Sequence, residues 1–286
     1  MRARAFAKVN FALRVSTVGR DGYHPLRGIF QTVTWFDEVE VSSADRDGVD
    51  VSGHPAPADH TNLAWRAVEA VRVAADSVEL LEVRLGKQIP AGAGLGGGSA
   101  DAAAALVLAS KVFGVGHDVL RSVAPELGSD VPFALVGGSA MVAGRGELVQ
   151  PLPDFSGFAL AVVVPPVELS TPDVYTMWDQ LGGPQGPPLE ERHLPPAMRE
   201  YAPLRNDLFP AAVAVAPAVD EWRAELSESW GVPVVMTGSG AGLFAFFATD
   251  DEAQSALDEI PPGARAAEVV EPIDRGWELI TDEVPR

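Results

Sequence analysis

Alternating apolar and polar residues predict β-strands in both halves of the chain. Residues 5–15 alternate well enough to form a strand with Val9, Phe11 and Leu13 on one face. Two strands, at residues 29–36 and 38–41, are expected to join at a break near Asp37. Further strands are predicted at residues 78–85, 139–143, 158–164, 232–236, 243–248 and 266–270.

Helices are predicted between these strands. Leu63, Val68 and Val71 recur at helical spacing, and Thr61 or Asn62 can cap the helix that they indicate. Another helix is expected to begin at Pro172 with Thr171 as its cap, because proline suits the first helical position. Further helices are predicted at residues 100–113, 207–215, 217–229 and 250–260.

The length of the chain, 286 residues, suits two modest domains. The composition changes near residues 151–156, and we place the boundary there, between domains at residues 1–153 and 154–286. A stretch rich in Gly and Pro at residues 182–196 predicts a surface segment in the second domain. Strands and helices alternate in both halves, so the predicted fold class is α+β.

Composition and charge exclude several classes of function. The chain has no cysteine, which excludes disulfides and thiolate catalysis, and its five histidines show no metal-binding spacing. A formal net charge of −19 argues against nucleic acid as a partner, since nucleic acid attracts Lys and Arg clusters. No apolar run reaches the roughly twenty residues that span a bilayer, and no signal peptide is recognisable. We therefore expect a cytoplasmic protein with no membrane partner.

The most informative motif is a glycine-rich run that leads into an alanine-rich helix. Five glycines fall within residues 92–98, so backbone N–H groups there can approach a ligand without interference from a Cβ atom. Ser99 or Asp101 can cap the helix that follows, and the N-terminus of that helix favours an anion. A donor-rich loop at the start of a helix is typical of a phosphate site.

Three known phosphate-binding loops could explain this run. A Walker A loop needs a lysine before its hydroxyl residue, and Gly98-Ser99 has none. The Rossmann glycine pattern is met, but Pro90 interrupts the strand that should lead into it. The third pattern, Pro-x-Gly-x-Gly-Leu-Gly-Gly-Gly-Ser, matches residues 90–99 at every position. The run resembles the nucleotide loop of the GHMP kinases.

In that family the glycine loop binds ATP, so the resemblance implies ATP as the phosphoryl donor. The implied nucleotide-binding residues are Pro90, Ala91, Gly92, Ala93, Gly94, Leu95, Gly96, Gly97, Gly98 and Ser99. Many members carry a glutamate for Mg²⁺, and this sequence shows no obvious equivalent. We therefore expect Mg²⁺ to be held mainly by the ATP phosphates and Ser99, and we assign no protein metal ligand.

A second set of motifs lies near the amino terminus. Lys8 stands inside an apolar strand, where a lone ammonium group is costly to bury and needs an anionic partner. Residues 7–10 (Ala-Lys-Val-Asn), 21–24 (Asp-Gly-Tyr-His) and 30–31 (Phe-Gln) resemble the signature of the diphosphocytidyl-methylerythritol kinases, one group of GHMP kinases. Their order and spacing are more specific than the glycine loop.

A third motif, Gly-Ser-Asp-Val-Pro-Phe, occupies residues 128–133. Its aspartate could simply cap a helix. In the family, this aspartate takes the proton from the acceptor hydroxyl beside the amino-terminal lysine, so the resemblance implies that Asp130 and Lys8 are the catalytic pair. The lysine would also steady the migrating phosphoryl group, and phosphoryl transfer depends largely on positioning and charge stabilisation.

Both predicted domains contribute to the implied acceptor site. Residues 237–241 (Thr-Gly-Ser-Gly-Ala) resemble the carboxy-terminal glycine motif of the family, which folds over the glycine loop. Members of the group hold a cytosine ring between two aromatic side chains, for which Tyr23 and Tyr175 are the candidates. The main chain and side chain of His24 would read the Watson–Crick edge of the base. The remaining implied substrate contacts are Asn10, Thr171 and Gly238.

The resemblance implies the two-domain GHMP kinase fold, with a ribosomal protein S5 domain 2-like N-terminal domain and a ferredoxin-like C-terminal domain. It implies ATP-dependent phosphorylation of the 2-hydroxyl of a cytidine-diphosphate-linked methylerythritol, in the non-mevalonate isoprenoid pathway. Two alternatives stay open: a GHMP kinase with another acceptor, such as homoserine or mevalonate, and a non-catalytic nucleotide-binding sensor on the same fold. The sequence is compatible with a monomer or a homodimer.

Overall fold

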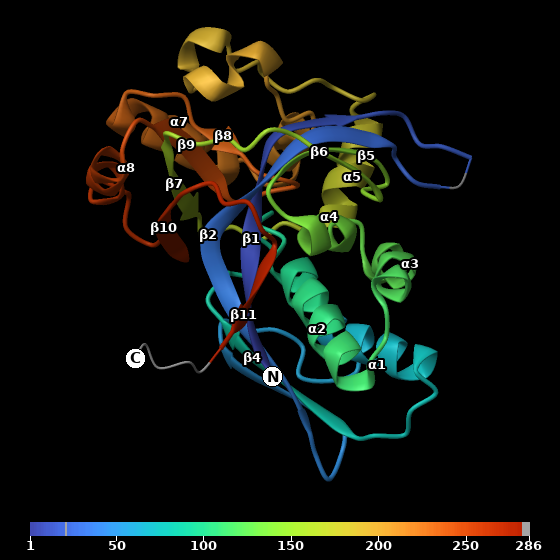
Figure 1. Ribbon diagram of the computed structural model, residues 1–286. Helices are drawn as coiled ribbons and strands as arrows, with labels where there is room; N and C mark the ends of the chain where they lie inside the picture. Colours follow the sequence, from blue (N-terminus) through green and yellow to red (C-terminus); the bar gives the residue numbers. More distant parts are fainter. Residues whose placement is uncertain (21, 282–286) are drawn as a thin grey trace.

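Two β-sheets with helices packed against them make up the fold (Figure 1). The computed structural model describes residues 1–20 and 22–281. Asp21, one residue of the amino-terminal motif, lies outside the described residues. Within the described part of the chain, no helix is long and apolar enough to cross a membrane.

The first sheet is built around two long strands. β1 (Arg2–Val15) and β2 (Leu26–Ser43) pair in the antiparallel direction, and most residues of β1 are buried. In the described residues the sheet has seven strands, in the order β11-β1-β2-β4-β3, with β5 also paired to β2 and β6 to β5. The other strands are β3 (Gly48–Gly53), β4 (Leu81–Lys87), β5 (Ser139–Gly144), β6 (Leu148–Pro151) and β11 (Trp277–Ile280).

The predicted break near Asp37 is wrong, because β2 runs through this residue without interruption. The side chain of Asp37 is fully buried and accepts hydrogen bonds from the backbone N–H groups of Gln88 (2.5 Å) and Ile89 (2.9 Å). It also pairs with the ammonium group of Lys87. A carboxylate with these partners can remain inside a buried strand.

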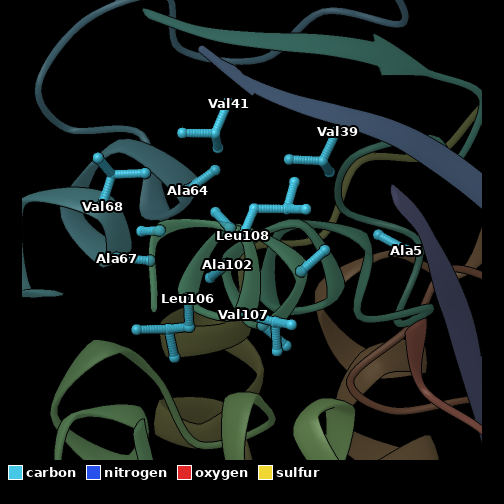
Figure 2. Close-up of a cluster of buried hydrophobic side chains, with 14 of the residues drawn as sticks. Ala5, Val39, Val41, Ala64, Ala67, Val68, Ala102, Leu106, Val107 and Leu108 are labelled. Atoms are coloured by element: carbon cyan, nitrogen blue, oxygen red, sulfur yellow. The ribbon is translucent and has the colours of Figure 1, made fainter. Parts of the chain in front are cut away.

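α2 (Gly97–Phe113) packs on β1 and β2 of the first sheet, and α1 (Leu63–Ala74), α3 (His117–Leu127) and α4 (Val131–Val136) pack against α2. α2 is buried without interruption from Ala100 to Ser110. Figure 2 shows Val39 and Val41 of β2 and Ala64 of α1 gathered around the alanine-rich helix. The small alanine side chains let the sheet and α1 approach α2 closely, which explains why the helix can be buried on more than one side.

α2 begins with a cap that differs from the one predicted. We expected Ser99 or Asp101 to cap it, but the helix starts at Gly97, its N-cap is Gly96 with φ 70°, and no side chain caps it. Glycine adopts this left-handed conformation without steric cost. Asp101 is instead buried, where it pairs with Lys87.

The second sheet is antiparallel, with strand order β10-β7-β9-β8. Helices lie between β7 and β8 and between β9 and β10, which gives the β-α-β-β-α-β order of the predicted ferredoxin-like arrangement. The strands are β7 (Ala159–Val164), β8 (Val235–Met236), β9 (Leu243–Phe247) and β10 (Ala266–Val270). The helices are α5 (Thr171–Gln180), α6 (Phe209–Val215), α7 (Ala218–Trp230) and α8 (Asp250–Leu257), with 3₁₀ turns at Glu191–His193 and Pro196–Tyr201.

The last described strand returns to the first sheet. β11 pairs antiparallel with β1, with Arg2 opposite Ile280, and Figure 1 shows the red strand beside the blue one. β11, β3, β6 and α3 were not predicted from the sequence. The division into domains at residues 153 and 154 stays a prediction.

Candidate active site

A cavity of about 870 Å³ is lined by segments from both halves of the chain. Its walls come from β1, the loop before β2, the glycine loop, the loop before α4, the start of α5 and the turn between β8 and β9. Every site residue predicted from the sequence lines it: Lys8, Asn10, Tyr23, His24, residues 90–99, Asp130, Thr171, Tyr175 and Gly238. The structure therefore brings together all the predicted site residues.

The carbonyl groups of the glycine loop hold it to the rest of the protein. Each carbonyl from residue 91 to residue 95 accepts a hydrogen bond from another segment. The donors, in order, are Arg265 Nη2 (2.8 Å), Ala241 N (3.3 Å), Gly242 N (3.1 Å), Lys8 Nζ (2.9 Å) with Thr237 Oγ1 (3.2 Å), and Lys8 N (2.9 Å). Most of these donors belong to the carboxy-terminal half, so the turn at residues 237–242 packs on the loop as the motif predicts.

The same loop has backbone N–H groups free to bind an anion. Among the described residues, no N–H from residue 91 to residue 96 donates to a backbone carbonyl. The first N–H groups of α2 come next, and the start of a helix leaves such groups without intrahelical partners. Gly92, Gly94 and Gly96 all have positive φ. Successive N–H groups in such a turn form an anion site, which suits the phosphates of a nucleotide.

Lys8 connects the glycine loop to Asp130. Its Nζ donates to the carbonyl oxygen of Gly94 at 2.9 Å and to Oδ1 of Asn10 at 2.6 Å, and it lies 3.3 Å from Oδ2 of Asp130. The Lys8 side chain is only 8% exposed, so the buried cation has the anionic partner that the sequence analysis required. Asp130 precedes α4, but its carboxylate makes no capping hydrogen bond. A cation and a carboxylate thus lie together at the phosphate loop.

The side-chain NH2 group of Asn10 is free for a ligand. Its Oδ1 accepts from Lys8, and its backbone N–H donates to Oγ1 of Thr237 at 3.0 Å. Its Nδ2 is buried and has no hydrogen-bond partner among the described residues. A buried donor without a partner is costly, so the Nδ2 group of this cavity residue suits a polar atom of a substrate.

The aromatic residues predicted for the acceptor lie in different environments. Tyr23 is 54% exposed, and the guanidinium group of Arg145 lies 4.3 Å from the centre of its ring. Tyr175 is partly buried, and this burial, followed by the nearby charge of Asp130, raises the pKa of its phenol to about 12. Tyr175 therefore stays neutral at physiological pH. Arg145, which also lines the cavity, was missed because nothing in its local sequence marks it.

His24 is fixed by partners on both ring nitrogens. Nδ1 lies 3.0 Å from the carbonyl oxygen of Ser16, and Nε2 lies 3.2 Å from Oδ2 of Asp179 on α5. The ring also packs against Tyr175, with 5.3 Å between ring centres. Among the described residues, the main-chain N–H and C=O of His24 make no backbone hydrogen bond. The main chain is therefore the part of His24 that can meet a ligand.

The second half of the chain contributes a hydroxyl pair. We expected Thr171 to be the cap of this helix, but α5 begins at Thr171 and its N-cap is Ser170. Oγ1 of Thr171 lies 2.7 Å from Oγ of Ser239, a cavity residue that the sequence analysis did not select. Asn206 supports this region, because its Nδ2 donates to the carbonyl oxygens of Met236 and Gly238 at 2.8 Å each.

Two carboxylates share one buried ammonium group next to the glycine loop. Lys87 pairs with Asp37 and Asp101, and all three side chains are 4% exposed or less. Burial raises the pKa of Asp101 to about 7, and the charge of Lys87 offsets this only in part. Burial lowers the pKa of Lys87, but the charges of Asp101 and Asp37 outweigh that effect and raise it.

Protein stability is expected to depend on pH through Asp101. A carboxyl whose pKa is raised on folding binds more protons in the folded state, so its stabilising contribution is present at low pH and is lost as pH rises through about 7. As the pH rises from about 5 to about 8, the free energy of unfolding of the Asp101→Asn variant should therefore increase relative to that of wild type. Urea unfolding of both proteins measures this, and an unchanged difference between them would contradict the prediction.

Comparison with known proteins identifies the family. Two family models match the chain, the GHMP kinases N terminal domain at residues 62–138 and the GHMP kinases C terminal at residues 192–262. A 4-diphosphocytidyl-2-C-methyl-D-erythritol kinase from Cutibacterium acnes is 37% identical over 255 residues, which cover 83% of this chain and 82% of the relative. The chain belongs to the GHMP kinase family.

Other relatives of this GHMP kinase extend the match. A protein of the same name from Saccharopolyspora erythraea is 36% identical and covers 98% of this chain and 94% of its own length. A crystal structure of 4-(cytidine 5'-diphospho)-2C-methyl-D-erythritol kinase has a TM-score of 0.79 at 32% identity, over 95% of this chain and 99% of that chain. A homoserine kinase from Cytophaga hutchinsonii shares the fold, with a TM-score of 0.69 at 19% identity over 98% and 97% of the two chains.

These comparisons confirm two expectations from the sequence. The two-sheet fold is that of the GHMP kinases. Membership of the family makes the chain an ATP-dependent small-molecule kinase.

Proposed function

We propose that this kinase transfers the γ-phosphoryl group of ATP to the 2-hydroxyl of 4-diphosphocytidyl-2-C-methyl-D-erythritol, in the non-mevalonate isoprenoid pathway. Relatives of that name are 37% and 36% identical over most of the chain. In the site, the observation that carries the proposal is the Lys8 ammonium group, which contacts both Gly94 of the phosphate loop and Asp130. The proposed base Asp130, the Lys8 cation and the phosphate loop thus lie next to one another. The reaction, which consumes ATP, belongs in the cytoplasm.

The residues at the loop fit a magnesium ion that arrives with ATP. In residues 1–20 and 22–281, no group of three or more His, Cys, Asp or Glu side chains could hold a metal. Mg²⁺ commonly keeps several waters and binds through substrate phosphates and one or two protein groups. The hydroxyl of Ser99, which lines the cavity, is the candidate protein group. When bound, the ion would neutralise phosphate charge.

Asp130 is the proposed base. It accepts the proton of the acceptor hydroxyl while that oxygen bonds to the γ-phosphorus of ATP and the bond from phosphorus to the β-phosphate oxygen breaks. The products are the phosphorylated acceptor and ADP. Lys8 steadies the transferring group, because its ammonium is already fixed between Asp130 and the carbonyl of Gly94 and needs no rearrangement.

The acceptor is proposed to bind through its cytosine ring. Tyr23 and Tyr175 hold the two faces of the ring, and the main chain of His24 reads its hydrogen-bonding edge. Asn10 contributes its free Nδ2 group. Thr171 and Gly238, which line the same cavity from the second half of the chain, meet the remaining polar groups.

An assay of ADP release across a panel of acceptors tests the function. The panel contains the cytidine-diphosphate conjugate, its uridine-linked analogue, mevalonate and homoserine. We expect turnover with the cytidine compound and rejection of the uridine analogue, because a mismatched base edge leaves buried polar groups unpaired. Preferred turnover of mevalonate or homoserine would contradict the substrate, and no turnover of any acceptor with intact ATP binding would favour the sensor.

Truncating either tyrosine to alanine is expected to weaken acceptor binding selectively. Stacking of a base on an aromatic ring contributes roughly 1–3 kcal/mol, so Tyr23→Ala and Tyr175→Ala should each raise the acceptor dissociation constant about five- to a hundredfold. ATP affinity should change little, because the glycine loop is formed by other residues. Calorimetric titration with each ligand measures both values.

Tyr201→Ala is the matched control for this experiment. Tyr201 packs against Phe155 and does not line the cavity, so its truncation should leave both affinities near wild type. If Tyr23→Ala lost ATP and acceptor binding in parallel, the clamp would be refuted. Equal turnover of the cytidine- and uridine-linked compounds would refute the proposed reading of the base.

A further inference from the structure

The loop between β1 and β2, at residues 16–25, carries two of the residues proposed to bind the acceptor, Tyr23 and His24, and we call it the acceptor loop. The backbone N–H of Ser16 donates to the carbonyl oxygen of Pro25 at 2.8 Å, so the two ends of the loop are joined to each other. This bond closes the loop, but it does not fix the loop relative to the second half of the chain. A contact that reaches that half is needed to hold the acceptor-binding residues in place.

The His24 side chain supplies this contact by packing on α5. Its ring centre lies 5.3 Å from that of Tyr175 and 5.5 Å from that of Trp178, and its Nε2 lies 3.2 Å from Oδ2 of Asp179. Residues spaced by three and four positions share one face of a helix, so α5 presents all three side chains to the ring. The contact with Asp179 is the polar one of the three, and it sets the direction in which the ring points.

The other ring nitrogen anchors His24 to its own loop. Nδ1 lies 3.0 Å from the carbonyl oxygen of Ser16, at the start of the acceptor loop. A carbonyl oxygen and a carboxylate oxygen both accept hydrogen bonds, so a ring nitrogen that carries a proton can donate to its partner. The His24 side chain is 11% exposed, whereas that of Asp179 is 48% exposed. The histidine is thus held between a backbone atom and a side chain that can be replaced without disturbing the core.

Reading a base through the main chain of His24 requires a fixed backbone orientation. In cytosine an amino group donates and ring N3 accepts, whereas in uracil a carbonyl oxygen accepts and N3–H donates. The main-chain N–H and C=O of His24 make no backbone hydrogen bond among the described residues, and they match cytosine only when the N–H faces N3 and the C=O faces the amino group. Hydrogen bonds weaken steeply as their angle falls, so a rotation of the acceptor loop would lose this match.

We propose that Asp179 is a positioning residue for base selection. By holding the ring of His24 against α5, it keeps the His24 main chain in the orientation that selects cytosine over uracil. The inference rests on the proposed function and deepens it. Asp179 is not among the described residues that line the cavity, so it acts through His24 and not on the acceptor itself. No covalent bond forms or breaks in this role.

Binding of both acceptors and of ATP to wild type, Asp179→Ala and Asp173→Ala tests this role. Calorimetric titration gives the dissociation constants of the cytidine-diphosphate conjugate and of a non-hydrolysable ATP analogue. The uridine-linked compound is measured by its displacement of the cytidine conjugate. Asp173→Ala removes the same charge from an exposed position in the first turn of the same helix, outside the cavity lining. Because an ion pair with a partly exposed partner contributes little to stability, Asp179→Ala should fold as wild type does.

In Asp179→Ala the cytidine conjugate should bind on the order of tenfold more weakly, the cost of a displacement smaller than the roughly 1 Å that costs about a hundredfold. The uridine-linked compound lacks the match and should bind as it does to wild type, so the preference for cytidine falls by the same factor. The ATP analogue should be unaffected, and Asp173→Ala should keep all three wild-type values. Asp179→Asn, whose Oδ1 can still accept from Nε2 of His24, should keep most of the preference.

An unchanged preference for cytidine in Asp179→Ala would overturn the inference and leave the proposed function standing. Equal weakening of both acceptors would also overturn it, because a general loosening of the acceptor loop affects both alike. A preference in Asp179→Asn as low as that in Asp179→Ala would exclude the hydrogen bond to His24 as the cause. Failure of the cytidine conjugate to bind wild type would overturn the proposed function and this inference with it.

Discussion

The Asp130→Asn variant is expected to turn over about two to four orders of magnitude more slowly than wild type, with ATP binding nearly unchanged. Asparagine has the size of aspartate but cannot accept the proton of the acceptor hydroxyl. Lys8 keeps its hydrogen bonds to Asn10 and Gly94 in the variant, so the glycine loop should hold its position. The loss should therefore fall on the chemical step.

Steady-state ADP release at saturating substrates measures turnover, and titration with a non-hydrolysable ATP analogue measures binding. Asp173→Asn is a matched control, because this exposed carboxylate in the first turn of α5 lies outside the cavity lining. It should behave as wild type. An Asp130→Asn protein that kept more than about a third of wild-type turnover would remove Asp130 from the role of base.

The hydrophobic pattern was sufficient to predict much of the fold because burial follows it closely. β10 occupies residues 266–270, as predicted. Asn62 caps α1 as expected, with its Oδ1 accepting from the N–H of Ala64 at 2.9 Å. In both cases the deciding interaction is local in sequence or set by simple periodicity. The prediction that Val9, Phe11 and Leu13 share one face of a strand is wrong. β1 has an irregularity between Asn10 and Ala12 that breaks the alternation, so Leu13 packs in a different hydrophobic cluster from Val9 and Phe11.

The errors have tertiary causes. The expected break at Asp37 and the expected caps on α2 both assigned polar residues to element ends. Asp37 and Asp101 are instead partners of Lys87, at sequence separations of 50 and 14 residues. Local propensity cannot reveal such a cluster, since each carboxylate becomes favourable inside the protein only when its distant cation is present.

Two missed elements show other limits of the pattern. β11 has only four residues, all half-buried, and exists because it pairs with the edge of β1. α3 contains Pro125, a residue that argues against a helix interior.

For the site, as for the fold, the local sequence predicted only part of what the structure shows. Short motifs predicted which residues line the cavity, but not how they are held. Arg265 donates to the carbonyl of Ala91, and Asn206, just before the predicted helix at residues 207–215, donates to the carbonyl of Gly238. Neither contact has a local sequence signal, because each joins segments that are distant along the chain.

Among the loop glycines, Gly94 rather than Gly97 is the position where a side chain would separate the loop from the turn at residues 237–242. The motif suggests that a side chain at Gly97 would block the phosphates, but a Cβ there would lie 3.0 Å from Cγ2 of Ile89, inside the core. A substitution at Gly97 would therefore disturb packing. At Gly94 the φ angle is +70°, and a Cβ would stand 2.2 Å from the carbonyl oxygen of Thr237.

Gly94→Ala is therefore expected to displace the glycine loop from the turn at residues 237–242 and to lower kcat/KM for ATP on the order of a hundredfold, the cost of a displacement of about 1 Å in a catalytic site. Its control is Gly114→Ala, because Gly114 has nearly the same φ, +69°, but nothing within 4 Å of a Cβ. Both variants carry the strain of alanine in the left-handed region, about 1–2 kcal/mol, so both should lose similar stability from that source. Only Gly94→Ala should lose activity. Equal activity of the two folded variants would show that the contact between the loop and the turn does not position ATP.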